Sequence, residues 1–330
     1  MIHSKMQFLH ESKTGRAMNF RQLKTLITIA DAGGFALAIG RLHLSQPAAT
    51  RQIQALEAEL GVPLFDRVGR RLRLTAEGEE VVRRGRRLLQ EADSLRDRAN
   101  AMKSGLTGTL RVGGSPQSIE TVLAPFVRHF RRRHPSIEVH FVEDGGARIN
   151  ARLEDGDAQL ALTTVSNEML GARLLFPVCI LVVVASSHPL GQRSSVEVAD
   201  LADVPLLLLQ RSFASRGWFD AECHNANVNP PIVLESGAPA TLMALAASGD
   251  GAAIVPSNVS IPRNGVKAIP VTYRGMPIGR WMLAAWDGRR FFPPFAQQFV
   301  DELVKHIRRS YPGRDVTKRV PPLRRPKLAE

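Results

Sequence analysis

Residues 42–61 read LHLSQPAATRQIQALEAELG and contain the most informative pattern of the chain. Apolar residues recur at helical spacing between Gln46 and Leu60, which predicts an amphipathic helix that ends at Gly61. The predicted buried stripe of this helix consists of Ala49, Ile53, Leu56 and Leu60. Polar side chains lie on the opposite face and toward the start of the helix, which leaves that end open to a partner.

Two shorter apolar-periodic segments precede this helix. The first covers 20–32 and is broken by Gly33-Gly34, and the second covers 35–42. The turn at 43–45 then joins the second helix to the third. Two helices joined by so short a turn, with Gln, Thr and Arg at the start of the second, predict a helix-turn-helix.

The chemistry of the exposed residues fits the major groove of DNA. Gln pairs with adenine, Arg pairs with guanine, and Thr reaches a base or a phosphate. Two short strands are predicted at 64–66 and 71–74, and the basic turn between them would form a wing against the backbone or the minor groove. The residues that we expect to contact DNA are Ser45, Gln46, Pro47, Thr50, Arg51 and Gln54 on the helix, and Arg67, Arg70 and Arg71 on the wing.

A long helix is predicted from the cap residue Thr75 to about Ser104. Its apolar or small residues alternate at spacings of four and three, as in a coiled-coil seam. We expect this seam to pair two copies of the chain, and the alternative is packing against its own domain. The seam consists of Val81, Gly85, Leu88, Ala92, Leu95, Ala99 and Met102.

The formal net charge of +13 is unevenly placed. Residues 1–105 carry +7 and residues 305–330 carry another +7, whereas residues 106–304 carry −1. A basic domain at one end of a near-neutral body favours a polyanionic partner such as nucleic acid. The alternative is that the positive charge only aids solubility.

Strands and helices alternate beyond residue 105, which predicts an α/β domain with a mostly parallel sheet. Strands are expected at 109–113, 138–143, 160–163, 180–185, 205–210, 232–236, 252–256 and 278–285. Helices are expected at 120–133, 147–155, 214–225, 239–248 and 293–309. The Pro- and Arg-rich tail at 310–330 is predicted to be disordered.

Three stretches together resemble the N-terminal domain of LysR-type transcriptional regulators: MNFRQLKTLITIADAGGF at 18–35, LHLSQPAATRQIQALEAELGVPLFDR at 42–67 and LRLTAEG at 72–78. The resemblance implies a winged helix-turn-helix, a linker helix and a two-lobed α/β effector-binding domain similar to type 2 periplasmic binding proteins. It also implies a dimer on an inverted repeat, a tetramer that bends DNA, and a small-molecule effector that changes RNA polymerase access. The expected divisions are an extension at 1–17, the DNA-binding domain at 18–75, the linker helix at 76–104, the effector domain at 105–309 and the tail at 310–330.

The sequence departs from the family at several positions. Gly34 stands where a Ser often precedes the second helix, Gly40 weakens that helix, and Thr50 replaces a common Ser. Residues 1–17 lie outside the resemblance, so Met18 is an alternative start. In the effector domain, the segment 143–146 (Glu-Asp-Gly-Gly) stands where relatives often keep a hydroxyl, and Gln159 replaces a common acidic residue before the third strand.

Ligand is expected between the lobes, on loops after strand ends and at helix starts. Ser115 lies where many family members place a ligand-binding Ser, and hydroxyls with free backbone N–H groups suit a carboxylate. An organic acid is therefore the expected effector, and ordinary helix caps and turns are the alternative role for these residues. The candidate residues are Ser115, Pro116, Gln117, Thr163, Thr164, Gln210, Ser212 and Gly237.

Other classes of protein are disfavoured. The two cysteines, Cys179 and Cys223, are too few for a disulfide scaffold, and structural thiols are favoured over a redox pair even though Arg216 and His224 could lower the pKa of Cys223. No metal, cofactor or enzyme motif is found, although the two-lobed fold also hosts enzymes. Without a signal segment or an apolar run of about 20 residues, we expect a cytoplasmic protein rather than an exported solute-binding protein. An architectural DNA-binding protein remains an alternative.

Overall fold

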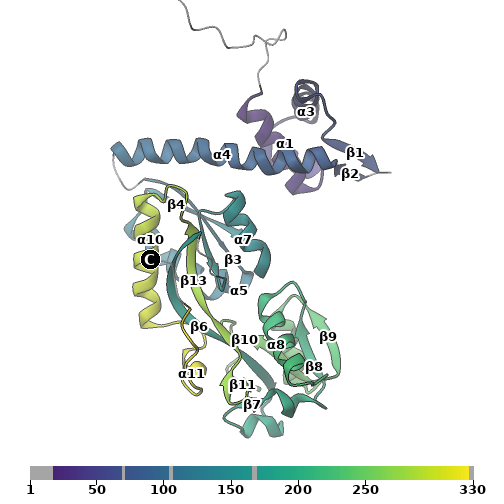
Figure 1. The fold of residues 1–330 in the computed structure, drawn as a ribbon, viewed down its shortest axis with the longest axis vertical. Helices are drawn as coiled ribbons and strands as arrows, with labels where there is room; N and C mark the ends of the chain where they lie inside the picture. The colour runs from purple at the N-terminus through teal and green to yellow at the C-terminus, as the bar shows by residue number, and fades with distance from the viewer. Residues whose placement is uncertain (1–17, 69–70, 104–106, 166–168, 327–330) are drawn as a thin grey trace, which may run out of the picture. The chain divides into compact units, whose positions relative to one another are not determined.

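The computed structural model describes residues 18–68, 71–103, 107–165 and 169–326 (Figure 1). The chain separates into two compact units, one ending at Asp93 and the other beginning at Ser94. Each unit is described by itself. The expected extension at 1–17 lies outside the described residues. None of the helices within the described ranges is long and apolar enough to cross a membrane.

The first unit begins with three helices: α1 (Phe20–Ala32), α2 (Phe35–Leu42) and α3 (Gln46–Leu60). These bounds agree with the sequence prediction. Asn19 and Gln22 form a reciprocal capping box at the start of α1, and Gly33 ends that helix with a φ of 71°. The strands β1 (Phe65–Val68) and β2 (Arg71–Leu74) pair antiparallel as the wing.

A small apolar core joins the three helices. Leu26, Ile29 and Ala38 are fully buried in it together with Ala49 and Leu56 of α3. Leu60 was predicted in the buried stripe and is instead 37% exposed. The reason is local, because Leu60 is the last residue of α3 and Gly61 turns the chain away with a φ of 71°.

The long helix α4 (Ala76–Lys103) follows the wing and extends past the division between the units. Thr75 caps it, because the Thr75 Oγ1 accepts a hydrogen bond from the Gly78 amide at 2.8 Å. Gly78 packs tightly against the chain before the wing. A β-carbon at this position would lie 2.1 Å from the backbone oxygen of Leu64, so the first turn of α4 requires glycine here.

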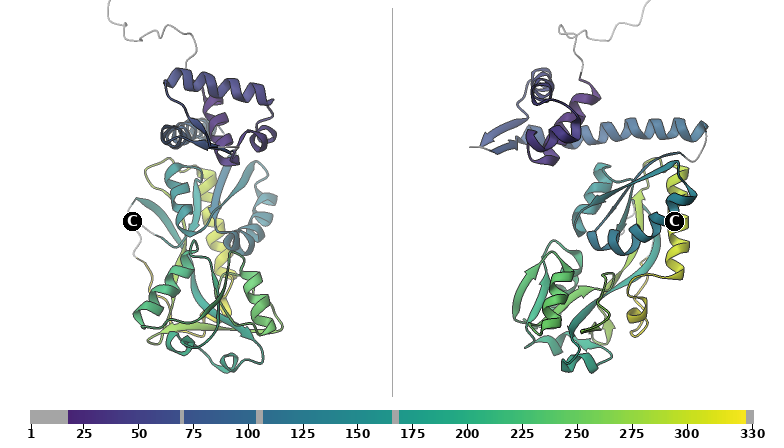
Figure 2. Two further views of the ribbon diagram at one scale, coloured as in Figure 1. Left: turned by 90° about the vertical axis from the view of Figure 1, so that its right-hand side faces the viewer. Right: turned by 180° about the vertical axis from the view of Figure 1, so that it is seen from behind.

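The second unit consists of two lobes built on one mixed sheet (Figure 1). Lobe 1 contains β3 (Gly108–Gly114), α5 (Pro116–Ser118), the π-helical turn η1 (Ile119–Leu123), α6 (Ala124–Arg133), β4 (Ile137–Glu143), α7 (Gly146–Asp155), β5 (Leu160–Thr163), β13 (Gly279–Asp287) and α10 (Pro294–Arg309). Helices α6 and α10 cover one face of its sheet, and α7 covers the other (Figure 2).

Lobe 2 contains the central part of the chain. Its elements are η2 (Pro189–Gln192), β7 (Val196–Glu197), η3 (Val198–Leu201), β8 (Leu206–Leu209), α8 (Ala214–Asn225), β9 (Ile232–Ser236), α9 (Pro239–Ser248), β10 (Ala252–Pro256), β11 (Val266–Tyr273) and β12 (Met276–Pro277). Helices α8 and α9 contact opposite faces of this sheet.

The strand β6 (Leu170–Ala185) belongs to both lobes. Its first part pairs with β13, and its last part pairs with β10 and β11, all antiparallel. The sheet is therefore mixed rather than mostly parallel, and the prediction was wrong on this point. Residues 170–179 were not predicted as strand, because Pro177 interrupts the apolar pattern.

The chain crosses between the lobes twice, through neighbouring strands. The first crossing is at Cys179–Ile180 in β6, and the second is at Ile278–Gly279 before β13. The two crossings touch, since the amide of Ile180 donates to the oxygen of Ile278 at 2.8 Å. These paired crossings form the hinge of the unit.

The tail was predicted to be disordered, and this prediction is wrong for residues 310–326. This segment belongs to the second unit, contains α11 (Arg314–Thr317) and packs against the lobes. Tyr311 stacks on Phe176, with ring centroids 5.2 Å apart, and the indole of Trp281 donates a hydrogen bond to the oxygen of Leu323 at 3.2 Å. A few apolar side chains thus anchor a segment whose overall composition resembles a disordered one.

Candidate DNA interface and ligand cleft

The exposed face of α3 carries the residues that were predicted to contact DNA. Ser45 is the N-cap residue, and its side chain makes no capping hydrogen bond. Gln46, Pro47, Arg51 and Gln54 are exposed, and Thr50 is half-buried. The start of α3 therefore presents hydroxyl, amide and guanidinium groups to solvent, which is the chemistry that reads base edges.

Hydrogen bonds at the other side of α3 hold its orientation within the first unit. The Thr25 Oγ1 of α1 donates to Gln52 Oε1 at 2.6 Å. Glu57 Oε1 accepts from the amides of Leu64 and Phe65 at 2.8 and 3.4 Å. The carboxylate of Glu57 is thus engaged at the far end of the helix, away from the face that would meet phosphate.

The wing is present, but its basic side chains are only partly described. Arg67 lies in β1 and Arg71 lies in β2, and their side chains fall outside the described parts of the chain. Arg70 also lies outside the described residues. Their contact with DNA remains a prediction from the sequence.

The predicted dimer seam on α4 divides into two parts. Val81 is half-buried and packs against the core of its own unit, and Gly85 faces Leu23 of α1. Val81 is thus engaged within its own chain, because the first turns of α4 cover α1. By contrast, Leu88 is 46% exposed and Leu95 is 68% exposed. Ala92 is half-buried, Ala99 is exposed, and the Met102 side chain lies outside the described residues.

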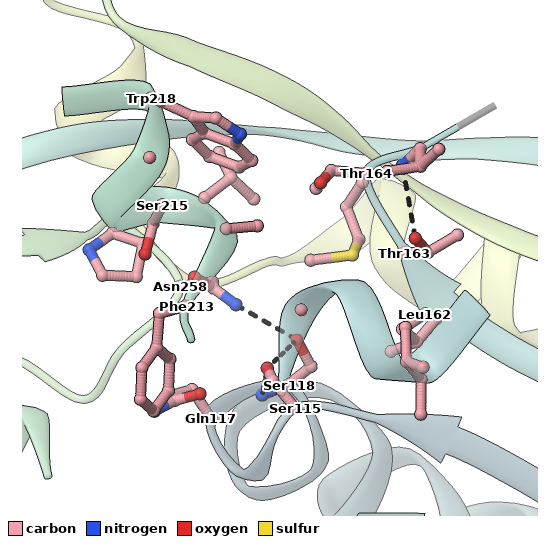
Figure 3. Close-up of a pocket in the computed structure, with 18 of the residues that line it drawn as sticks. Ser115, Gln117, Ser118, Leu162, Thr163, Thr164, Phe213, Ser215, Trp218 and Asn258 are labelled. Atoms are coloured by element: carbon pink, nitrogen blue, oxygen red, sulfur yellow. Dashed lines mark hydrogen bonds between the residues drawn. The ribbon is translucent and has the colours of Figure 1, made fainter. Parts of the chain in front are cut away.

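A cavity of about 270 Å³ lies between the two lobes (Figure 3). Five of the predicted ligand residues line it: Ser115, Gln117, Thr163, Thr164 and Ser212. Pro116, Gln210 and Gly237 are not among its lining residues. Gln210 and Gly237 instead lie beside each other, since a β-carbon at Gly237 would be 3.3 Å from Gln210 Oε1.

A chain of hydrogen bonds crosses the floor of this cavity (Figure 3). Ser115 caps the helical segment that begins at Pro116, and its Oγ donates to Ser118 Oγ at 3.0 Å. Asn258 of lobe 2 donates from Nδ2 to the same Ser118 Oγ at 3.2 Å. The Thr163 hydroxyl is already occupied, because it donates to Asn150 at 2.9 Å and accepts from the Val165 amide at 3.2 Å.

Several lining residues were not predicted from the sequence. Arg211 stands at the start of the loop after β8, next to the predicted Gln210 and Ser212. Asn258 and Trp218 also line the cavity. Arg211 lies between the predicted Gln210 and Ser212, whereas nothing local in the sequence marks Asn258. Asn258 follows β10 and reaches Ser118 of the other lobe only in the folded chain.

Three helix starts converge on the cavity. They are the starts of the helical segment at Pro116, of α7 at Gly146 and of α8 at Ala214. Gly146 and Ala214 touch across the cleft, since a β-carbon at Gly146 would lie 2.8 Å from the Ala214 nitrogen. A side chain at position 146 would therefore clash with Ala214. Helix starts carry free N–H groups and partial positive charge.

The charge of the cavity wall has one sign. Arg211 is the one cationic residue among the described lining residues, and no Asp or Glu is among them. Much of the remaining wall is apolar and includes Ile149, Leu162, Val178, Trp218 and Met282. The arrangement suits a small anion with an apolar body.

Both cysteines are buried thiols. Burial raises the pKa of Cys179 to about 11. Burial and the nearby carboxylate of Asp220 raise the pKa of Cys223 to about 12, and the opposing effect of Arg216 is smaller. The suggestion that Arg216 and His224 lower the pKa of Cys223 was therefore wrong, and the reactive thiolate form is disfavoured at neutral pH.

Both units match known protein families. Residues 20–79 match the family described as bacterial regulatory helix-turn-helix protein, lysR family, and residues 103–308 match the LysR substrate binding domain. The regulator BsdA of Bacillus subtilis (strain 168) is 31% identical over 295 residues, covering 86% of this chain and 99% of BsdA. OxyR of Escherichia coli (strain K12) is 29% identical over 259 residues, covering 77% of this chain and 85% of OxyR.

A solved structure of a full-length relative agrees. Full-length CbnR complexed with its target DNA is 27% identical, with a TM-score of 0.61, and the match covers 88% of this chain and 99% of CbnR. A full-length protein that was solved with its target DNA thus shares the fold of this chain over most of its length. From these matches and this architecture, the chain belongs to the LysR family of DNA-binding transcriptional regulators.

Proposed function

We propose that this regulator binds an inverted-repeat promoter site as a homo-oligomer and changes transcription when a small organic acid enters the cleft between its lobes. The chemical class of the effector is inferred from the cavity wall. Three helix starts and Arg211 converge there, and none of the described lining residues is acidic. A bound carboxylate would gain hydrogen bonds from N–H and hydroxyl groups and an ion pair with Arg211.

The DNA-binding mode follows from the α3 face. Gln46, Thr50 and Arg51 would read the major groove, with Ser45, Pro47 and Gln54 beside them and the wing arginines on the backbone. The determined structure of CbnR with its target DNA supports a duplex as the partner. A dimer would place two recognition helices on two half-sites and so require an inverted repeat.

Two exposed apolar surfaces support self-association. Leu88 and Leu95 lie on α4, and Ile232, Val233 and Leu234 are exposed on the edge strand β9. A second copy would cover such surfaces. Two pairing surfaces per chain are enough to build a tetramer that bends DNA, and a ligand that binds one assembly state more tightly would change RNA polymerase access.

The volume of the cavity restricts the ligand. At about 270 Å³ it is slightly smaller than the usual pocket for a drug-sized molecule, which favours a small effector.

The described lining of the cavity contains no His, Asp, Glu, Lys or Cys that could act as a general base beside the Ser and Thr hydroxyls. We therefore propose an effector site in a cytoplasmic regulator without catalytic activity or cofactor.

DNA binding is tested by gel-shift titration of the full-length chain. The probes are the DNA upstream of its own gene and a scrambled duplex, each at two salt concentrations. We expect roughly a thousandfold preference for the upstream fragment and a loss of about 1–3 kcal/mol in Arg51→Ala. Arg87→Ala, on an exposed part of α4, is the control. Equal and steeply salt-dependent binding to both duplexes would favour an architectural protein.

The effector class is tested by thermal unfolding with three probes: benzoate, succinate and benzylamine. A carboxylate probe should raise the melting temperature, and Arg211→Ala should abolish the rise. Arg263→Ala, an exposed arginine outside the cleft, should retain it. Stabilisation by benzylamine alone would contradict an acidic effector.

A further inference from the structure

We propose that residues 310–326, the C-terminal strap, hold the two lobes of the effector domain at a fixed angle by packing across their hinge. The consequence for ligand binding rests on the proposed effector function. The match to the LysR substrate binding domain ends at residue 308, so the strap lies outside the matched region. The family match therefore says nothing about the strap, and its role must be argued from the contacts in this chain.

The strap begins on lobe 1. The ring of Tyr311 stacks on Phe176 of β6, with centroids 5.2 Å apart and an interplanar angle of 20°. Tyr311 also packs against the lobe 1 core that includes Phe126 and Phe299. The Tyr311 hydroxyl is within 3.2 Å of the Thr317 hydroxyl, which ties the start of the strap to α11.

The strap then reaches the hinge at Gly313, where φ is 76°. A β-carbon at Gly313 would lie 2.4 Å from the backbone oxygen of Ser257. Ser257 is bonded in turn to the first crossing of the chain, because its amide donates to the Cys179 oxygen at 2.7 Å and its Oγ accepts from the Cys179 amide at 3.1 Å. The strap backbone thus lies directly on a residue that is hydrogen-bonded to the hinge.

Lobe 2 and the second crossing provide the remaining contacts. Val316 packs against the lobe 2 core around Leu181 and Val255. Leu323 packs beside Gly279, where a β-carbon would lie 3.0 Å from its Cδ1, and its backbone oxygen accepts the Trp281 indole at 3.2 Å. The guanidinium of Arg325 lies 5.3 Å from the centre of the Trp281 ring.

Along its length the strap therefore contacts lobe 1, then Ser257 beside the first crossing, then lobe 2, and last the second crossing. Figure 1 shows α11 beside β6 at this place. The strap is attached to lobe 1 where Tyr311 stacks on Phe176 and to lobe 2 where Val316 packs. A change in the angle between the lobes must alter the distance between these two attachment points. The strap would then have to slide or detach. A fixed strap thus favours one lobe angle, and a ligand that requires another angle binds more weakly.

The test measures the lobe angle in the full-length protein. Spin labels at Arg132→Cys on α6 and Ala247→Cys on α9 are both exposed and report the distance between the lobes. Cys179 and Cys223 are buried and are left in place. Labelled chains are diluted into an excess of unlabelled chains so that only distances within one chain are read by double electron–electron resonance.

Three variants complete the design. Gly313→Ala inserts a β-carbon against Ser257 and displaces the strap, and a chain ending at Arg309 removes it. Gly275→Ala is the matched control, since Gly275 has a φ of 74° and nothing within 4 Å of its added β-carbon. We expect a shifted or broadened distance distribution in Gly313→Ala and in the truncated chain, and the wild-type distribution in Gly275→Ala.

The outcomes separate the two proposals. Distributions that are the same in all folded variants would overturn the strap proposal. If the truncated chain fails to fold, Gly313→Ala alone decides. Absence of DNA binding by the wild-type chain would contradict the proposed function without changing the distance result, whereas an unchanged distance would leave the DNA and effector assignments intact.

Discussion

Asn258 donates a hydrogen bond from Nδ2 to Ser118 Oγ at 3.2 Å and so connects lobe 2 to lobe 1 at the floor of the cleft. The side chains are almost fully buried, with 4% and 1% of each residue exposed. A second bond strengthens the junction, because the Thr121 hydroxyl donates to the Asn258 backbone oxygen at 2.9 Å. The relative position of the two lobes therefore depends on polar contacts as well as on the hinge.

Removal of one partner of the Asn258–Ser118 bond should destabilise the effector unit. Asn258→Ala leaves Ser118 without this donor, and we expect a loss of about 1–3 kcal/mol in the free energy of unfolding. The measurement is urea unfolding of both single variants and of the double variant Asn258→Ala with Ser118→Ala. Strictly additive losses would contradict a direct interaction between these two side chains.

The exposed leucines of α4 should control self-association. Leu88→Asp with Leu95→Asp places two charges on the seam, and we expect monomers by light scattering. Arg87→Asp is the control. It changes the net charge by the same two units, at an exposed position next to Leu88, and should leave the oligomer intact. A stable oligomer in the double Asp variant would show that another surface, such as β9, is sufficient.

Two glycine-to-alanine changes in the first unit should have opposite effects. Gly78→Ala forces a β-carbon to within 2.1 Å of the Leu64 oxygen, and we expect destabilisation by about 1–3 kcal/mol. Gly40→Ala lies inside α2 with nothing within 4 Å, and we expect stabilisation by about 0.5–1 kcal/mol. Thermal unfolding of the two variants beside wild type measures both. If both variants were stabilised, or both destabilised, the space around each glycine would not explain its effect on stability.

The two thiols should be inert toward peroxide at neutral pH. Their pKa values of about 11 and about 12 leave very little thiolate, which is the form that peroxide oxidises. After treatment with hydrogen peroxide, intact mass should show both cysteines reduced, and Cys179→Ser with Cys223→Ser should bind DNA as the wild type does. A sulfenic acid or a disulfide between them would contradict this expectation and indicate a redox role for the thiols.

Asp287 should make stability sensitive to acid. Its carboxylate accepts from Arg289 at 2.8 Å and from Arg290 at 3.1 Å, and hydrogen bonding by Arg289 lowers the pKa of Asp287 in the folded chain. Because the pKa in the unfolded chain is about 3.9, the stabilisation is present above that pH and is lost as pH falls through the lower folded value.

The difference in the free energy of unfolding between wild type and Asp287→Asn, measured as a function of pH, tests this dependence. It should be largest at about pH 6 and shrink toward about pH 2.5. Asp250→Asn, at an exposed position, controls for the loss of one negative charge. A difference that stays constant over this range would mean that Asp287 acts only through its shape.

Local signals were sufficient to predict most of the first unit. The bounds of α1, α2 and α3 follow from apolar spacing, Gly33 and Gly61, and the cap at Thr75 correctly predicts the start of α4. These features depend on residues three or four positions apart. The same locality limits the seam prediction, because the spacing alone does not show that Val81 already packs against the core of its own unit.

Long-range contacts decide the features that the sequence did not reveal. The first part of β6 pairs with β13 although Pro177 interrupts its pattern, and the strap is ordered by Phe176 and Trp281. Polar residues at the ends of β3, β5 and β8 pointed to loops that do line the cavity, although ligand binding there stays a prediction. Asn258 was missed because its neighbours in sequence carry no signal for ligand binding.

The positions of the three tryptophans give the protein separate optical reporters. Trp218 lines the ligand cleft, Trp281 lies beneath Arg325 of the strap, and Trp286 stacks on Phe292 with centroids 4.5 Å apart. Variants that keep one tryptophan and replace the others with Phe would emit from one site each. Intrinsic fluorescence could then follow entry of a ligand and release of the strap as distinct events, in real time and without an added label.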